Sequence, residues 1–164
     1  MSGPDVSDGD PPKGANKPRS AARLAAVQGL YQMDLAATDI ADVIAQFATR
    51  FGADGEGGAP DVADRLFFAE LLRGVVRRQL EIDPLVDARL AGGWRLNRLD
   101  SILRAILRSG AFELMERRDI PAKVIISEYV DVAKAFFTGE EPKVVNGVLD
   151  KLAREQRPNE VGGG

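Results

Sequence analysis

The stretch DSILRAILRSGAFELME, from Asp100 to Glu116, decides the fold class of this chain. Its apolar side chains recur every three or four residues, which is the spacing of one buried stripe on an α-helix. The stretch therefore predicts a strongly amphipathic helix with one face in the core. The apolar positions in register are Leu99, Ile102, Leu103, Ile106, Leu107 and Leu114.

The segments on either side show the same spacing, or residues that start and stop helices, and none alternates as a strand would. Ser20 is predicted to cap the first helix, and Asp83-Pro84 to begin a short separate helix. Four glycines between Gly52 and Gly58 predict the loop that ends the second helix. We expect one all-α domain of about seven helices, at 19–35, 39–51, 61–80, 83–90, 100–116, 121–137 and from 142 onward.

The two ends of the chain differ in composition from this helical body. Residues 1–18 hold four prolines among glycine, serine and aspartate, with almost nothing to bury, and are predicted to be a disordered leader. Residues 159–164 are predicted to be a flexible tail. The helical domain is therefore expected to span residues 19–158.

Composition restricts the chemistry that the chain can perform. The 164 residues include no cysteine and no histidine, which excludes disulfides, thiol nucleophiles, Cys/His zinc sites and imidazole-dependent triads. We therefore expect no catalytic residues, no metal and no cofactor, and a binding protein rather than an enzyme. No secretory signal and no apolar run of membrane-spanning length is present, so the sequence predicts a cytoplasmic protein.

Two local patterns suggest chemistry and are better explained without it. The glycines around Gly55 lack the GxxxxGK[ST] spacing of a phosphate loop, so a flexible connection is the better interpretation. Glu113 and Glu116 lie within reach of Arg108 and Arg117, and solvated ion pairs are expected there.

Charge placement is more informative than net charge. The segment from Pro11 to Met33 carries four cations and no acid, a local charge of +4 in a chain of −3. Arg19 and Arg23 share one side of the predicted helix, and Gln28 and Tyr31 follow one to two turns later. Cations, an amide and an aromatic ring are the components of single-stranded RNA recognition. The alternative is a basic helix end followed by a tyrosine half-buried in the core.

A second basic run lies around the central stretch. Arg95, Arg98, Arg104 and Arg108 leave the apolar face of the predicted helix free. They form either a solvated face or a docking surface for phosphate or an acidic partner, and the sequence leaves both interpretations open.

Four motifs together resemble the NusB family of bacterial transcription antitermination factors. RLAAVQGLY at 23–31 is similar to an arginine-rich start leading into AVQALY, and ILR followed by FEL at 106–114 is similar to a family ILR…YEL. IPAKVIISE at 120–128 is similar to a VPxKVAINE helix start. VNGVLDK at 145–151 nearly repeats the family's FVNGVLDK signature. The four matches are collinear and extend over roughly residues 19–158.

The resemblance implies a fold of two small helical bundles and a role without catalysis. Members of the family pair with the ribosomal protein NusE, and the pair binds the boxA element of nascent RNA. The complex helps RNA polymerase to read through terminators, notably in ribosomal RNA operons. A homodimer that hides the RNA face is a further expectation. An RNA-binding module of a cytosine methyltransferase and a self-associating structural protein are the rival interpretations.

The resemblance also suggests which residues form the sites. The arginine-rich helix start falls on Lys17, Arg19 and Arg23, which are assigned to RNA phosphates. The other assigned RNA-binding residues are Gln28, Tyr31, Phe136, Lys143 and Asn146, and the assigned partner-binding residues are Tyr31, Arg98, Leu103 and Arg104. Close helix packing is the structural alternative for Asn146-Gly147.

Three departures from the family pattern bear on these sites. Val144 stands where relatives often have phenylalanine, and Leu103 where relatives are often acidic. Ser20, Ala21 and Ala22 replace further arginines. We therefore expect weaker RNA binding by the chain alone and a stronger dependence on the partner.

Overall fold

The computed structural model describes residues 13–54 and 62–162, and the side chains of 19–49 and 64–160. The regular elements of the described residues are all helices, with no strand, which confirms the predicted all-α class. Residues 1–12 of the predicted leader lie outside this part. The elements are α1 (Lys13–Ala36), α2 (Ile40–Asp54), α3 (Val62–Arg89), η2 (Leu96–Arg98), α4 (Ser101–Glu116), α5 (Ala122–Phe136), α6 (Glu141–Gln156) and η3 (Pro158–Gly162).

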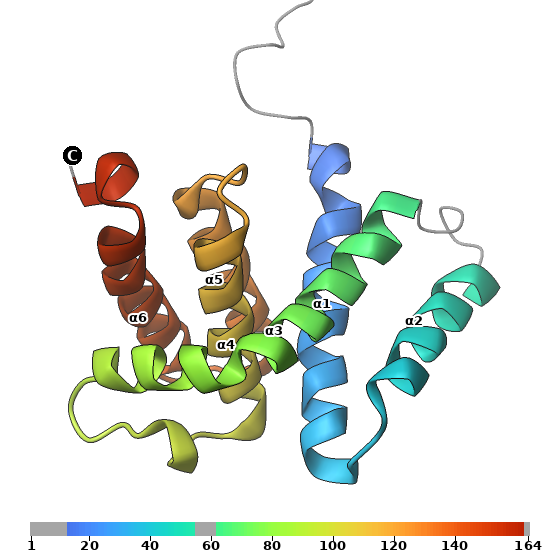
Figure 1. The fold of residues 1–164 in the computed structure, drawn as a ribbon, viewed down its shortest axis with the longest axis horizontal. Coiled ribbons are helices and arrows are strands. Elements are labelled where there is room, and N and C mark those ends of the chain that lie inside the picture. The colour runs from blue at the N-terminus through green and yellow to red at the C-terminus, as the bar shows by residue number, and fades with distance from the viewer. Residues whose placement is uncertain (1–12, 55–61, 163–164) are drawn as a thin grey trace, which may run out of the picture.

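The helices form two groups that share α3 (Figure 1). α1 and α2 pack against each other and against α3, while α4, α5 and α6 pack together, and α4 and α6 also contact α3. α4 contacts α1, α3, α5 and α6, and its side chains are buried almost without interruption from Leu103 to Leu114. The central stretch of the sequence is therefore also the centre of the core.

The predicted break before Pro84 is wrong, because α3 continues through it to Arg89. Proline removes one N–H and frees the carbonyl of the residue four positions earlier, which here is the solvent-exposed Leu80. Ile82 and Val86 are fully buried on the other side, so core packing holds the helix together across the missing bond. α3 ends at Arg89, and the chain turns three residues later, where Gly92 and Gly93 adopt positive φ values of 62° and 97°.

The predicted helix starts and ends are corrected at three places. α1 begins at Lys13, so Ser20 is not a cap and its hydroxyl donates instead to Glu128 Oε1 at 2.7 Å. α2 continues to Asp54, past the predicted stop at Gly52. The predicted tail forms the turn η3, from which Glu160 Oε2 accepts a hydrogen bond from Ala122 N, at the start of α5, at 2.6 Å.

The predicted start of the last helix is confirmed, because Pro142 lies in the first turn of α6. The structure adds a cap that was not predicted, since Asp100 accepts a hydrogen bond from Ile102 N at 2.8 Å at the start of α4. Within the described helices, none is long and apolar enough to cross a bilayer.

Candidate nucleic-acid interface

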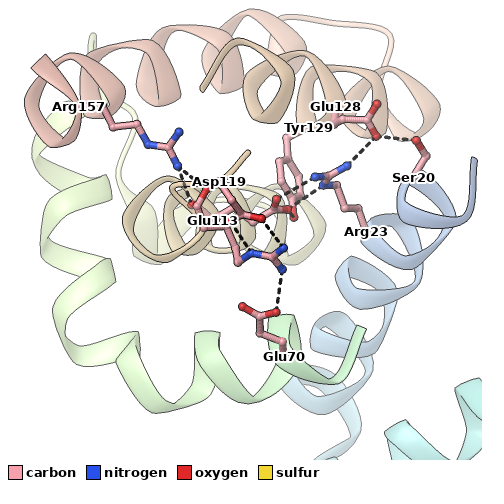
Figure 2. Close-up of polar contacts among 9 residues, drawn as sticks. Ser20, Arg23, Glu70, Glu113, Asp119, Glu128, Tyr129 and Arg157 are labelled. Carbon is pink, nitrogen blue, oxygen red and sulfur yellow. Dashed lines mark hydrogen bonds and ion pairs between the residues drawn. The ribbon is translucent and has the colours of Figure 1, made fainter. Parts of the chain in front are cut away.

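Arg23 lies inside the protein and not on the predicted RNA surface. Its side chain is 3% exposed and forms a two-pronged ion pair with Glu113, with Nε to Oε2 at 2.8 Å and Nη2 to Oε1 at 2.9 Å. Nη1 donates to Glu128 Oε1 at 3.2 Å (Figure 2). A phosphate could reach this guanidinium only by displacing Glu113, so the assignment of Arg23 to RNA phosphates is corrected.

Glu113 is the buried acid that holds this network together. It is fully buried rather than solvated, which corrects the predicted surface pairing with Arg108 or Arg117. The Tyr129 hydroxyl also donates to it, and burial raises the pKa of Tyr129 well above its ordinary value. Burial acts to lower the pKa of Arg23, but the hydrogen bond and charge of Glu113 outweigh it, so the Arg23 pKa is raised and the guanidinium stays charged.

Arg19 lies one helical turn before Arg23 and remains partly accessible. Its guanidinium carbon lies 5.4 Å from the centre of the Phe67 ring, which is a cation–π contact. Among the described residues it has no ion-pair partner, so its charge is available to a ligand. Lys17 lies on α1 just before it, and its side chain is outside the described set.

A groove of about 280 Å³ brings together three of the predicted RNA-binding residues. Gln28 and Tyr31 reach it from α1, and Phe136 from the end of α5. Phe136 is 38% exposed, whereas its neighbour Phe137 packs against the core. The groove thus offers an accessible ring and a tyrosine to a planar ligand.

Sequence reasoning missed three residues that also line this groove. Gln32 of α1 donates to Gln46 of α2 at 3.2 Å, so two amide side chains lie beside Tyr31. Ile102 of α4 lines the apolar wall. Gln32 follows Tyr31 directly and could have been suspected, but no local pattern connects Gln46 with α1.

Lys143 and Asn146 are exposed on the first turns of α6, outside this groove. Asn146 lines a separate hollow between α5 and α6, together with Ser127 and Lys134. A Cβ on Gly147 would meet nothing within 4 Å, so the alternative of close helix packing does not hold there. The close approach occurs at Gly110, where a Cβ would lie 2.7 Å from Leu149.

The second basic run lines a hollow of about 1020 Å³ beside η2, which we call the arginine hollow. Three of its four arginines form ion pairs. Arg108 forms two hydrogen bonds of 2.8 Å with Asp83, and Arg104 donates to Asp34 at 2.9 Å and to the carbonyls of Leu96 and Leu99. Both arginines are therefore already engaged in contacts within the protein.

The remaining predicted partner residues have contrasting positions. Arg98 is exposed and has no ion pair within the described part of the chain. Leu103 is 1% exposed in the core, so its assignment to a partner surface is corrected. Tyr31 lines the groove on α1 and not the arginine hollow.

Known proteins similar to this chain share one family. The model of the NusB family matches residues 20–154. The transcription antitermination protein NusB of Rhodopseudomonas palustris (strain BisB18) is 51% identical over 156 residues, which cover 93% of this chain and 92% of that protein. A solved structure of T. maritima NusB has a TM-score of 0.76 at 30% identity and covers 90% of this chain and 99% of that one.

A further solved structure shows the same fold at lower identity. It is a crystal structure of antitermination factors NusB and NusE in complex with dsRNA, with a TM-score of 0.72 and 23% identity. The match covers 85% of this chain and 98% of that one.

Proposed function

Because this chain belongs to the NusB family, we propose that it is a transcription antitermination factor that binds boxA-type single-stranded RNA together with NusE. In this role it works in the cytoplasm, on nascent ribosomal transcripts, as part of an RNA polymerase antitermination complex. It supplies a binding surface and no catalytic group.

The groove between α1, α2 and α5 is the observation that carries this proposal. Single-stranded RNA is recognised through unstacked bases that lie on aromatic rings and form hydrogen bonds along their edges. Phe136 and Tyr31 supply rings, and Gln28, Gln32 and Gln46 supply amides at the same groove. A base seated on Phe136 would have these amides within reach of its edge.

The cations proposed for the RNA backbone lie on α1 and α6, outside the lining of this groove. Arg19 and Lys17 precede Gln28 on α1, and Lys143 lies in the first turn of α6, where free N–H groups favour phosphate. Arg23 is not among them, because it is committed to Glu113. Three cations is a modest number, which supports a shared RNA site that NusE completes.

The NusE contact is proposed at Arg98 and Tyr31. Arg98 is an exposed cation that lines the arginine hollow. Arg104 would act through the backbone carbonyls that it holds in the loop before α4, and Leu103 would support that loop from the core.

The RNA site is tested by binding measurements across a salt series. Three phosphate contacts to a single strand predict a slope of about −2 in a plot of log affinity against log salt, and Arg19→Ala should flatten it by about 0.7. Arg154→Ala is the matched control, since Arg154 is exposed and pairs with Asp150 on α6. An unchanged slope for Arg19→Ala would remove this residue from the site. A duplex of the same sequence, used as competitor, separates single-strand from double-strand recognition.

The shared site is tested by titrating NusE into the same assay. NusE should tighten RNA binding by about 1–3 kcal/mol of coupling free energy. Independent binding of RNA and NusE would contradict a shared site.

A homodimer that covers the RNA groove is a second proposal about the free protein. Sedimentation with and without RNA tests it, since RNA should dissociate such a dimer. A dimer that persists at saturating RNA would place its interface elsewhere.

A further inference from the structure

The outer face of α3 exposes large apolar side chains that none of the other described elements covers. Leu66, Val76 and Leu80 are 64%, 46% and 94% exposed. In Figure 1, α3 crosses in front of α1, and α3 is the nearer of the two helices to the viewer. An almost fully exposed leucine on a well-packed helix makes no contribution to the core of this domain.

Two arginines lie in the same stripe. Arg73 and Arg77 are exposed on turns between Leu66 and Leu80. Positions 66, 73, 77 and 80 recur at the spacing of one helix face, and the stripe extends over about 21 Å. We refer to Leu66, Arg73, Val76, Arg77 and Leu80 as the α3 outer face.

Arg73 and Arg77 differ from the nearby Arg78 and Arg117 in their ion pairing. Arg78 pairs with Glu81 and Glu116, and Arg117 pairs with Glu70 and Asp119. Arg73 and Arg77 have no ion-pair partner among the residues that the structure describes. The α3 outer face thus combines exposed leucines with unpaired positive charge.

We propose that the α3 outer face binds an acidic amphipathic helix of another protein. The partner helix would place apolar side chains against Leu66 and Leu80 and carboxylates beside Arg73 and Arg77. Apolar contact would supply most of the affinity, while the carboxylate–guanidinium pairs would fix the register.

The charge pattern favours this occupant over a second copy of the chain and over RNA. Two copies joined face to face would bring the arginines of one α3 toward those of the other, and like charges in contact are unfavourable. RNA phosphates would satisfy the arginines but would leave the leucines without an apolar partner. An acidic amphipathic helix satisfies both kinds of side chain.

This surface is separate from the proposed RNA and NusE sites. None of its five residues lines the groove at Tyr31 or the arginine hollow. The proposal therefore does not depend on the proposed function, and variants of the α3 outer face should keep their RNA affinity.

The experiment uses the full chain and a fluorescently labelled helical peptide, with binding followed by anisotropy. The peptide carries leucines about four turns apart and glutamates on the turns between them. A shuffled peptide of the same composition, and a peptide with lysine in place of glutamate, are the peptide controls. Leu66→Ser with Leu80→Ser, and Arg73→Glu with Arg77→Glu, are the test variants. Leu35→Ser is the matched control, because Leu35 is 61% exposed but lies on α1.

We expect the glutamate peptide to bind the unaltered chain and Leu35→Ser equally, and each double variant about 10-fold more weakly, which is about 1.4 kcal/mol. The charge-reversed variant should prefer the lysine peptide instead. Equal binding of the glutamate and shuffled peptides would overturn the proposal.

Two other outcomes would also overturn it by identifying a different occupant. A dimer in sedimentation that Leu66→Ser with Leu80→Ser abolishes would make the face a contact between copies. A loss of RNA affinity in Arg73→Glu with Arg77→Glu, without one in the leucine variant, would make it a nucleic-acid surface.

Discussion

The beginnings of α1 and α4 carry arginine pairs with identical spacing and contrasting environments. Arg19 and Arg23 on α1 divide into one accessible cation and one buried partner of Glu113. On α4, Arg104 forms an ion pair with Asp34 and Arg108 forms one with Asp83. Spacing thus predicts which side of a helix an arginine occupies, but the acid that meets it comes from a distant part of the chain and decides its role.

The largest effect should come from breaking the buried ion pair between Arg23 on α1 and Glu113 on α4. Arg23→Ala leaves Glu113 charged and enclosed, so we expect it to lower the free energy of unfolding by about 3–5 kcal/mol. Urea denaturation followed by circular dichroism measures this loss. Arg78→Ala is the matched control, because the ion pairs of Arg78 lie near the surface and contribute about 0–1 kcal/mol.

The same variant separates the two roles of an arginine on α1. Below its unfolding transition, Arg23→Ala should bind RNA with an unchanged salt slope, while Arg19→Ala should have the flattened slope and normal stability. The reverse result would show that Arg23 is the ligand of the phosphates and that its pairing with Glu113 opens on binding.

A smaller loss is expected at Arg157, an arginine held mostly by backbone. Its side chain is 2% exposed and donates to the carbonyls of Glu113, Leu114, Arg117 and Ile120, at the end of α4 and in the loop that follows. Helix C-termini leave such carbonyls without partners, so Arg157→Ala should cost about 2–3 kcal/mol. Arg154→Ala on the exposed side of α6 should change stability by less than about 0.5 kcal/mol. Equal losses in the two variants would contradict the capping role.

The helices were predictable from sequence because the three- to four-residue spacing of apolar side chains identifies the buried face of each helix. The α4 stripe and its cap at Asp100 follow from neighbouring residues alone. Pro84 misled, since its local preference for a helix start is outweighed by the burial of Ile82 and Val86. Ser20 misled for a similar reason, because its partner Glu128 is 108 positions away.

The candidate site was less predictable than the fold. Gln28, Tyr31 and Phe136 were named from sequence motifs, and the structure places them on one groove. Gln46 lines the same groove only because α2 packs against α1. Leu103 and Arg23 were predicted at the surface but are buried, because α4 lies at the centre of the core. Which polar side chains of a helix stay accessible depends on the acids and surfaces that other helices bring against them, and a single segment does not contain that information.

Beside α4, the paired Arg104 and the exposed Arg98 should differ in their effects on stability and on NusE binding. Arg104→Ala removes the contacts to Asp34 and to two loop carbonyls, so we expect a loss of about 1–1.5 kcal/mol in the free energy of unfolding. Arg98→Ala should stay within about 0.5 kcal/mol, because this side chain is exposed and unpaired in the described part of the chain. NusE titration should show the opposite order, with Arg98→Ala weakened more. A larger NusE defect in Arg104→Ala at equal stability would move the partner contact to Arg104.

The smallest effect concerns Asp119, whose carboxylate lies beside the arginines around Phe67. The hydrogen bond from Arg117 lowers the pKa of Asp119 to about 2, and the charge of Arg19 adds to this shift. In the unfolded chain the pKa is about 3.9, so the stabilisation is fully present above that pH and is lost as pH falls toward 2. Asp119 is 62% exposed, so solvent screening reduces the contribution to about 0.5 kcal/mol.

Asp119→Asn should therefore be slightly less stable at pH 7 and should lose less stability than the unaltered chain between pH 4 and pH 2. Parallel urea titrations at several pH values measure both effects. In Arg19→Ala the acid-side loss should be smaller than in the unaltered chain, because one of the charges that stabilise the carboxylate is removed. If Arg19→Ala kept the acid limb of the unaltered chain while Asp119→Asn flattened it, Arg19 would face solvent too openly to affect Asp119, which would make it the more available of the two α1 arginines for a phosphate. An acid limb that Asp119→Asn leaves unchanged would contradict the stabilising role of the Asp119 carboxylate.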